Sequence, residues 1–315
     1  MQMNLPFRRL PQILAAVAAA AAVPHAAAID LMVGLTVNNR LVSFNSAAPT
    51  QLTNNVAITG LQVGETILGI DMRPSNGLLY GLGSSNRVYV LDAATGAVTS
   101  SVAMTGATLA GNAFGIDFNP VADSTGLPSL RVVSDAEQNL RINVSTGAVT
   151  VDSPLLAGNP PGSVDPTIGG SAYSNNVPGA TTTTLYNIDY NFDRLVIQSP
   201  PNEGRLTRVG ELSPLSPPPL GANVTTDLLG FDISGPSGTA FASLTLPAAT
   251  GSQLFTINLT NGVATLVGGI GGVGDNQMLR GLAVVSVVPE PASVVMLGLG
   301  LAGLLVHSRR KARAA

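Results

Sequence analysis

The stretch Ile67-Leu68-Gly69-Ile70-Asp71-Met72-Arg73-Pro74 decides the fold of this sequence, because it recurs along the chain. It returns as Ala113-Phe114-Gly115-Ile116-Asp117-Phe118-Asn119-Pro120 and as Leu228-Leu229-Gly230-Phe231-Asp232-Ile233-Ser234-Gly235. Weaker copies at 169–173 and 279–285 carry alanine where the others carry aspartate. Repeats of about 40–50 residues are typical of the blades of a β-propeller.

Each full copy is followed by the same succession of short apolar runs and turns. After the first copy come runs at 77–82 and 87–92 and the pair Thr95-Gly96, and the second copy continues in the same way to Thr146-Gly147. In these runs Val, Ile and Leu alternate with polar residues, as they do in half-buried strands. Glycine accepts the positive φ of a tight turn. We therefore predict four short strands in each unit.

The two ends of the repeat complete each other. Predicted strands at 31–36, 39–44 and 56–58 match the second, third and fourth strands of a unit, and the missing first strand is 281–286. A ring closed in this way leaves no blade with an unfinished edge. We predict an all-β, five-bladed, β-propeller-like ring, with a β-sandwich or a solenoid as the alternatives. The predicted blades are 67–102, 113–152, 169–213, 228–267 and a composite of 279–288 with 31–60.

The N-terminal segment is typical of a secretory signal peptide. Arg8-Arg9 precede an apolar run at 13–23, and His25-Ala26-Ala27-Ala28 ends the segment. We expect cleavage after Ala28. The alternative, a membrane anchor, is disfavoured because the run is shorter than the roughly 20 residues of a transmembrane helix.

The C-terminal segment predicts a short transmembrane helix at 292–306, followed by a basic cluster that stays in the cytoplasm. Together with Pro289-Glu290-Pro291 it resembles the PEP-CTERM sorting signal of Gram-negative bacteria. The resemblance implies export by the secretion machinery, anchoring by this helix, processing by an exosortase, and a final place at the cell surface or outside the cell. The predicted organisation is a signal peptide at 1–28, a domain at 29–288 and a sorting tail at 289–315.

The central domain also resembles a known family. The pattern Gly-Ile-Asp-x-x-Pro, then Leu-Tyr-Gly-Leu, then Thr-Gly is similar to the family catalogued as domain of unknown function 4394. The resemblance covers about 31–288 and implies an exported, β-propeller-like repeat. The family has no assigned activity and no assigned functional residues, so the resemblance implies no role for any side chain.

Composition excludes several functions for the domain between the two end segments. Residues 29–290, which include Glu290 of the tail motif, keep all 18 carboxylates but only nine arginines, a formal net charge of −9, which disfavours nucleic-acid binding. The domain contains no His, Cys, Lys or Trp. Ser-His-Asp and Cys-His catalysis, zinc sites built from Cys or His, and Schiff-base chemistry are therefore excluded. A hard, oxygen-preferring cation such as calcium remains compatible with the carboxylates, and no other cofactor is expected.

The repeated aspartates Asp71, Asp117 and Asp232 are the strongest candidate site. Equivalent residues of the first strands of a propeller converge on its central channel, where three carboxylates would repel one another or bind a cation such as calcium or sodium. An acid–base pair is a second interpretation. The favoured alternative is structural: each aspartate accepts hydrogen bonds from N–H groups of its own following turn, as in Asp71 with Ser75-Asn76-Gly77.

A second pair of carboxylates, Asp189 and Asp193, has a spacing that could serve a glycosidase, which uses two carboxylates about 5 to 9 Å apart. Because Asn and Asp dominate tight turns, we favour a hairpin turn between two strands for this segment.

These observations favour an exported, non-enzymatic protein that binds or builds part of the bacterial envelope or extracellular matrix. Its expected partners are the exosortase, the secretion machinery, and an extracellular polysaccharide or an envelope protein. The alternatives are a carboxylate-dependent extracellular glycosidase and a cation-dependent hydrolase on a propeller scaffold.

Overall fold

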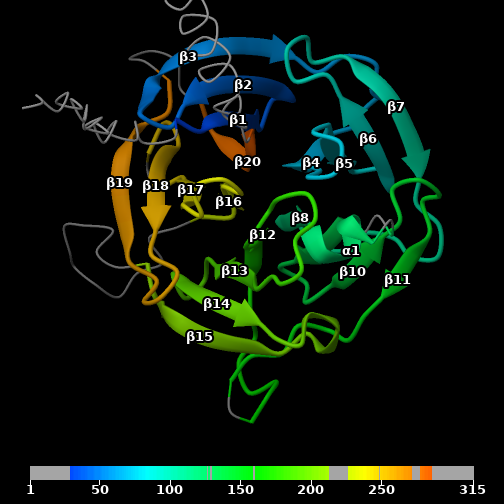
Figure 1. The fold of residues 1–315 in the computed structure, drawn as a ribbon, viewed down its shortest axis with the longest axis vertical. Coiled ribbons are helices and arrows are strands. Elements are labelled where there is room, and N and C mark those ends of the chain that lie inside the picture. The colour runs from blue at the N-terminus through cyan, green and yellow to red at the C-terminus, as the bar shows by residue number, and fades with distance from the viewer. Residues whose placement is uncertain are drawn as a thin grey trace, which may run out of the picture.

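The computed structural model describes residues 29–125, 127, 130–158, 160–212, 226–247, 249–271 and 277–285. In these ranges, five four-stranded antiparallel sheets are arranged as blades around a central axis (Figure 1). The domain is therefore a five-bladed β-propeller, as the repeat predicted, and not a sandwich or a solenoid. No helix within the described ranges is long and apolar enough to span a membrane. The predicted cleavage at Ala28, the motif Pro289-Glu290-Pro291 and the helix at 292–306 lie outside the described residues.

We number the blades along the chain and name their strands from the axis outward. Blade 1 consists of β20 (Leu279–Val285), β1 (Leu31–Thr36), β2 (Arg40–Asn45) and β3 (Ala48–Ala57). Blade 2 consists of β4 (Ile67–Met72), β5 (Leu79–Gly83), β6 (Arg87–Leu91) and β7 (Val98–Ala103). Blade 3 consists of β8 (Phe114–Phe118), β9 (Leu130–Ser134), β10 (Asn139–Ile142) and β11 (Val149–Val151). Blade 4 consists of β12 (Ile168–Tyr173), β13 (Leu185–Asp189), β14 (Arg194–Gln198) and β15 (Leu206–Glu211). Blade 5 consists of β16 (Leu229–Ile233), β17 (Ala240–Leu244), β18 (Gln253–Ile257) and β19 (Ala264–Gly269).

Blade 1 closes the ring with strands from both ends of the domain. β20 pairs antiparallel with β1, with Val285 opposite Leu31 and Leu282 opposite Gly34. The strand predicted at 281–286 thus completes the unit that begins at 31–36, as the sequence indicated. Closure gives β1 a partner on its inner side and leaves no exposed strand edge there.

Within the described ranges, two short helices interrupt the strands. The helix α1 (Pro120–Ser124) follows β8, and the 3-10 helix η1 (Pro201–Glu203) follows β14. Asn119 caps α1, because its Oδ1 atom accepts hydrogen bonds from the N–H groups of Val121 at 3.0 Å and Ala122 at 3.1 Å. Both helices contribute residues to a groove that is described below.

Glycine in the inner strands allows the blades to approach closely at the axis. A Cβ atom on Gly115 would lie 2.7 Å from backbone atoms of Gly170 and Ser171 in the next blade. A Cβ atom on Gly230 would likewise overlap the backbone of Leu282. The repeated glycine before each aspartate is therefore a consequence of five inner strands meeting around one axis.

The Thr-Gly turns connect neighbouring blades at the rim. Gly96 and Gly147 have positive φ values of 75° and 77°, as the predicted turns require. Beside Gly147, Thr105 of the preceding connection donates its N–H to the Gly147 carbonyl at 2.9 Å, and Val149 donates its N–H to the Thr105 carbonyl at 2.9 Å. Beside Gly96, Thr59 forms the same parallel bridge with Ala97. The turn of one blade is thus held by the chain that arrives from the blade before it.

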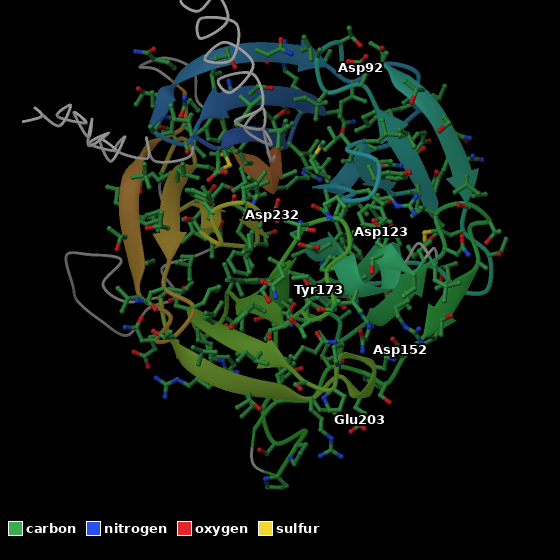
Figure 2. All side chains as sticks on the ribbon, viewed as in Figure 1. Asp92, Asp123, Asp152, Tyr173, Glu203 and Asp232 are labelled. Carbon is green, nitrogen blue, oxygen red and sulfur yellow. The ribbon has the colours of Figure 1, made fainter. Side chains whose placement is uncertain are left out.

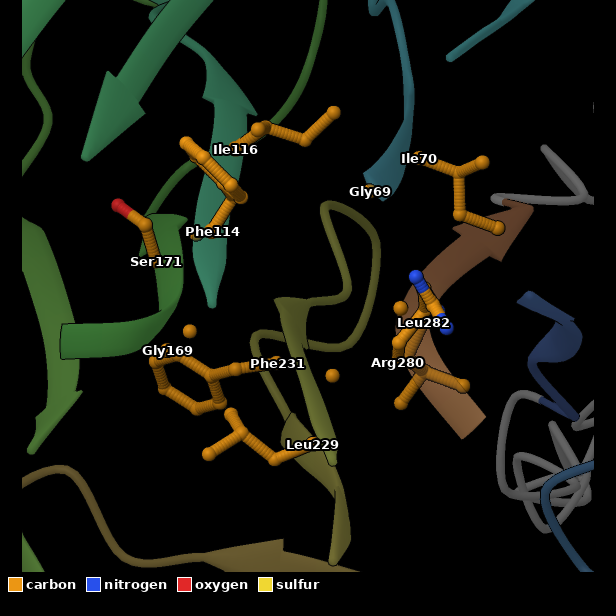
Figure 3. Close-up of a pocket in the computed structure, with 14 residues that line it drawn as sticks. Gly69, Ile70, Phe114, Ile116, Gly169, Ser171, Leu229, Phe231, Arg280 and Leu282 are labelled. Carbon is orange, nitrogen blue, oxygen red and sulfur yellow. The ribbon is translucent and has the colours of Figure 1, made fainter. Parts of the chain in front are cut away.

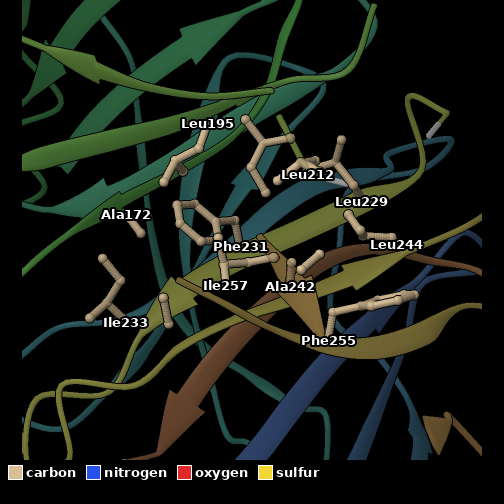
Figure 4. Close-up of a cluster of buried hydrophobic side chains, with 13 residues drawn as sticks. Ala172, Leu195, Leu212, Leu229, Phe231, Ile233, Ala242, Leu244, Phe255 and Ile257 are labelled. Carbon is tan, nitrogen blue, oxygen red and sulfur yellow. The ribbon is translucent and has the colours of Figure 1, made fainter. Parts of the chain in front are cut away.

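Apolar side chains fill the spaces between blade faces. Figure 4 shows such a cluster between blades 4 and 5. Ala172 and Leu195 from blade 4 pack there with Phe231, Ala242 and Ile257 from blade 5, and all five are buried. Since each blade has two faces to cover, the inner three strands are buried on both sides and the outer strand is exposed. No disulfide contributes, because the chain has no cysteine.

Candidate functional site

The structure brings Asp71, Asp117 and Asp232 together at the axis. They lie on the inner strands β4, β8 and β16, and each offers a carboxylate oxygen within 4.8 Å of the other two. Their exposed fractions are 1%, 0% and 1%. Figure 2 places Asp232 near the centre of the ring and Asp92 and Glu203 at its rim. We call these three residues the axial aspartates.

Each axial aspartate bonds to the blade that follows its own. Asp71 Oδ2 accepts a hydrogen bond from the N–H of Phe118 at 2.8 Å, and Asp117 Oδ2 accepts one from Tyr173 at 3.2 Å. Asp232 Oδ2 accepts one from Val284 in β20 at 2.6 Å. The three donors occupy equivalent positions, directly after the aspartate or alanine of their own strand. The carboxylates therefore link neighbouring blades at the axis.

This arrangement corrects the predicted structural role of the aspartates. Asp71 was expected to bond to its own turn at Ser75-Asn76-Gly77, but the Ser75 N–H donates to Asp123 Oδ2 at 2.9 Å. The interpretation was right that backbone N–H groups are the partners, and wrong about which ones.

Two blades have alanine in place of the aspartate, and the N–H group in the blade that follows each of them has a different acceptor. Ala283 in β20 precedes blade 2, and Ala172 in β12 precedes blade 5. Without a carboxylate from the preceding blade, Met72 donates its N–H to Asp71 Oδ1 at 2.7 Å. Ile233 donates its N–H to Asp232 Oδ1 at 2.6 Å in the same way. Three carboxylates thus accept from all five equivalent N–H groups of the ring.

One carboxylate oxygen is left over from this ring of hydrogen bonds. The axial aspartates have six oxygens, and the five N–H groups occupy five of them. The sixth is Asp117 Oδ1, which is buried and has no hydrogen-bond partner among the described residues. Asp117 differs from the other two because the Phe118 N–H that it could accept is already bonded to Asp71.

Burial and mutual repulsion make the axial aspartates weak acids. Burial raises the pKa of Asp71 and of Asp117 well above the ordinary value, and the charges of the neighbouring axial aspartates raise both further. Burial raises the pKa of Asp232 to about 7, although the N–H groups of Val284 and Ile233 oppose this increase. Three ionised carboxylates at this distance need either protons or a cation to compensate their charge. Carboxylate oxygens are ligands for hard cations such as calcium.

A narrow channel lies between the inner strands (Figure 3), and its lining includes Ile70, Ile116 and Phe231, which directly precede the three axial aspartates in the sequence. Its volume is about 10 Å³, which is close to the lower limit for one water molecule or ion. The inner strands of all five blades contribute residues to its lining, such as Gly69, Ser171 and Phe231. Arg280 also lines it, and its buried Nε atom has no hydrogen-bond partner among the described residues. Such a channel excludes substrates of ordinary size from the axial aspartates.

A second polar site lies between blades 3 and 4, and we call it the interblade groove. Its volume is about 580 Å³. The lining includes Arg131 and Arg141 from blade 3 and Asn202 from η1, together with Asn143 and Thr150. This groove was not predicted from the sequence. The available signal was Arg131 itself, a charged residue in the middle of an apolar strand.

Arg131 is the buried centre of the interblade groove. Its Nη1 atom donates to Asp152 Oδ2 at 2.6 Å and to Asn139 Oδ1 at 2.7 Å, and its Nη2 atom donates to Asn202 Oδ1 at 2.7 Å. Arg141 is more exposed and binds the same Asp152 with two hydrogen bonds of 2.8 Å. Burial raises the pKa of Asp152, but the two arginines lower it more, so that the net shift is downward. The two arginines and the one aspartate together carry a net charge of +1.

The structure places Asp189 and Asp193 at a hairpin, as the favoured interpretation predicted. Asp189 ends β13 and is buried, and it accepts hydrogen bonds from Arg194 Nη2 at 2.8 Å and from Thr167 Oγ1 at 3.1 Å. Asp193 adopts a positive φ of 46° in the turn that leads to β14. The segment therefore has the geometry of a turn rather than of a pair of catalytic carboxylates.

Two family models match this chain. The family described as a domain of unknown function (DUF4394) matches residues 40–283, and the PEP-CTERM protein-sorting motif matches residues 287–311. No curated protein matches the sequence.

Solved structures show only distant similarity. Hydrazine synthase of Kuenenia stuttgartiensis is 17% identical over 65% of this chain and 51% of its own, with a TM-score of 0.36. A protein of unknown function from Bacteroides thetaiotaomicron is 18% identical over 76% of this chain and 58% of its own, with a TM-score of 0.43. A nidogen/laminin complex is 11% identical over 82% of this chain and 98% of its own, also with a TM-score of 0.43. The chain thus spans about half the length of the first two, and these similarities assign no function.

Proposed function

Because the chain belongs to the family described as a domain of unknown function, DUF4394, and carries a PEP-CTERM motif, we propose that it is an exported binding protein without catalytic activity. The motif implies recognition by an exosortase-type sorting system, export, and membrane anchoring before processing. The proposal adds that the processed protein acts at the cell surface or in the extracellular matrix. There it binds a carboxylated polysaccharide in the interblade groove.

The observation that carries this proposal is the excess positive charge in the groove. Nine arginines and 17 carboxylates make residues 29–288 strongly acidic, yet Arg131 and Arg141 share the single carboxylate of Asp152 at this place. A carboxylate on a ligand would compensate the remaining charge. Arginine binds carboxylates through parallel N–H donors, which gives both affinity and orientation.

The size and the amide side chains of the groove support a sugar polymer as the ligand. Its 580 Å³ is within the range of about 300–1,000 Å³ typical of ligand pockets. Asn143 and Asn202 use their Oδ1 atoms for bonds within the protein, to the Ser145 N–H and to Arg131. The Nδ2 group of each asparagine is therefore the donor that could bind a ligand hydroxyl group. The chain has no tryptophan for stacking on a sugar ring, so recognition would depend on charge and hydrogen bonds.

The state of the nearby carboxylate favours binding over catalysis. A glycosidase needs one carboxyl group with a raised pKa to act as the general acid. The pKa of Asp152 is lowered instead, because Arg141 and Arg131 stabilise its ionised form against the opposing effect of burial. The axial aspartates have raised pKa values, but they are buried away from the groove.

The test is binding of the exported protein to a polyuronate and to an uncharged glucan, measured by calorimetry. We expect binding of the polyuronate only, with an affinity that decreases as salt increases. Arg141→Ala should weaken it by at least about tenfold, as expected for loss of hydrogen bonds to a charged group. Arg208→Ala removes the same charge from the exposed pair with Glu211 and is the matched control, with less than about a twofold effect.

Two results would contradict the proposal. Equal affinity for the glucan, or an Arg141→Ala variant that binds like the parent, would show that the groove does not recognise carboxylates. Hydrolysis of a chromogenic glycoside that disappears after a single carboxylate substitution would establish the glycosidase alternative.

A further inference from the structure

The axial aspartates have more negative charge than their surroundings compensate. Asp123, Asp152 and Asp189 are also buried carboxylates, and each of them binds an arginine at 2.6 to 2.8 Å. No arginine among the described residues forms such a pair with an axial aspartate. Their partners are the five backbone N–H groups, which carry only partial positive charges.

The unpartnered oxygen of Asp117 is a second, independent observation. Asp117 is fully buried, and its Oδ1 atom has no donor among the described residues, although a buried polar atom without a partner is costly. The other five axial oxygens each accept an N–H group. Carboxylate oxygens can accept a hydrogen bond and bind a cation at the same time, so the N–H groups do not exclude an ion.

The spacing of the carboxylates fits a calcium ion. Three oxygens that are no more than 4.8 Å apart have a common point within about 2.8 Å of each (4.8 Å divided by √3), and calcium–oxygen distances are about 2.3–2.6 Å. A small inward movement of the side chains would therefore complete the contacts. Calcium takes six to eight oxygen ligands, and three carboxylates supply up to six when each binds through both oxygens. Magnesium is a poorer fit, because it retains several waters and the channel of about 10 Å³ has space for about one.

We propose that Asp71, Asp117 and Asp232 bind one calcium ion, which links blades 2, 3 and 5 at the axis. The ion is structural rather than catalytic, because the aspartates are buried and the channel beside them is too narrow for a substrate. This site is independent of the interblade groove and differs from a cation-dependent hydrolase, in which the metal must contact the substrate.

The test begins with the metal content of the exported protein. We expect elemental analysis to find one calcium per chain. Thermal unfolding should be compared in about 1 mM calcium and in excess EDTA, with a midpoint about 5 to 10 °C higher in calcium. Protein without calcium and without a difference between the two conditions would overturn the proposal. A similar increase with sodium or potassium alone would overturn the assignment to calcium.

A substitution separates the cation from an ordinary structural role. In Asp117→Asn, the remaining side-chain oxygen can still accept the Tyr173 N–H, and the new amide group can donate to a neighbouring axial carboxylate. This variant should contain no calcium and should have the same midpoint of thermal unfolding in calcium and in EDTA. That midpoint should be higher than the parent's in EDTA and lower than the parent's in calcium. A variant that keeps the calcium response of the parent would overturn the site.

The matched control is Asp92→Asn at the rim. Asp92 also accepts backbone N–H groups, from Ala94 and Thr95 at 2.9 Å each, but it lies at an exposed turn. It should keep the full calcium response. If Asp117→Asn does not fold, the calcium content and the EDTA response of the parent still decide the proposal.

Discussion

The axis and the interblade groove both bury charged groups, but they compensate the charge in different ways. At the axis, three carboxylates meet without an arginine and depend on backbone N–H groups from successive blades. In the groove, Arg131 is surrounded by a carboxylate and two side-chain amide oxygens. The axis therefore retains a negative excess in a closed space, and the groove retains a positive excess in an open one. This difference suggests a small structural cation for the axis and a larger anionic ligand for the groove.

The two regions also differ in what holds the blades together. Axial contacts join backbone to backbone, since Gly115 lies directly against Gly170 and Ser171. Groove contacts join side chains from distant parts of the chain, since Arg131 reaches Asn202 of η1. We therefore expect an added side-chain atom to destabilise the axis, and removal of a hydrogen-bond partner to destabilise the groove. The predictions below test this contrast, in order of expected effect.

Loss of the buried arginine should have the largest effect. Arg131→Met would remove the buried member of the ion pairs of Asp152, which would keep only Arg141, and would leave the Oδ1 atoms of the buried Asn139 and of Asn202 without their arginine donor. Breaking a buried ion pair by removal of one partner costs about 3–5 kcal/mol, and we expect this decrease in the free energy of unfolding by urea denaturation. The exposed Arg208→Ala should change it by less than about 1 kcal/mol. A decrease below about 1 kcal/mol for Arg131→Met would show that the groove is not a structural centre.

Added volume at the axis should have the next largest effect. Gly115→Ala places a Cβ atom 2.7 Å from backbone atoms of Gly170 and Ser171, which cannot rotate away. Overpacking of this kind costs about 1–3 kcal/mol of the free energy of unfolding. Gly269→Ala on the outer strand β19 is the control, because its Cβ atom would meet nothing within 4 Å. If both substitutions had the same small effect, the blades would have to be less tightly packed at the axis than described.

The pH dependence of stability should have opposite signs for the two regions. The pKa of Asp232 is raised to about 7 in the folded state, so in calcium-free buffer the protein loses stability as pH rises from about 4 through 7. One proton accounts for at most about 1.4 kcal/mol per pH unit. The pKa of Asp152 is lowered in the folded state. Its contribution to the free energy of unfolding is therefore fully present above pH 3.8, the ordinary pKa of an aspartate, and is lost as the pH falls below that value. Urea denaturation at a series of pH values should therefore show a maximum near pH 4–5.

The control for this pH dependence is Asp232→Asn. It should reduce the slope between about pH 4 and 7 and leave the decrease at lower pH unchanged. A parent protein that becomes more stable between pH 5 and 7 in calcium-free buffer would contradict the raised pKa values at the axis.

Much of this architecture could be predicted from the sequence because its causes are local and repeated. The alternation of apolar residues and the recurrence of Gly-x-Asp identify blades 2, 3 and 5, and the weaker copies with alanine identify blades 4 and 1. The pairing of β20 with β1 follows, because a unit without a first strand needs the one at the other end. The convergence of Asp71, Asp117 and Asp232 on the axis follows from their equivalent positions in three blades.

The rest depends on contacts between blades, for which the sequence contains no local signal. The aspartates bond forward to N–H groups of the next blade, whereas the Ser75 N–H of the predicted turn bonds to Asp123. The partners of Arg131 are 8, 21 and 71 residues away, and nothing in their spacing indicates that they meet. The odd oxygen of Asp117 appears only when the N–H groups of all five blades are counted together.

The smallest effect should come from a hydroxyl group in the axial channel. Ser171 lines the channel, and its buried Oγ atom has no hydrogen-bond partner among the described residues. Because a hydroxyl group without a partner contributes nothing favourable in a buried place, Ser171→Ala should leave the free energy of unfolding within about 0.5 kcal/mol or raise it slightly. Ser243→Ala is the matched control, since Ser243 has the same kind of unpartnered, buried Oγ atom on β17 and does not line the channel. A loss of more than about 1 kcal/mol for Ser171→Ala alone would mean that the hydroxyl binds a water molecule in the channel, and the axis would then be a hydrated site rather than a dry one.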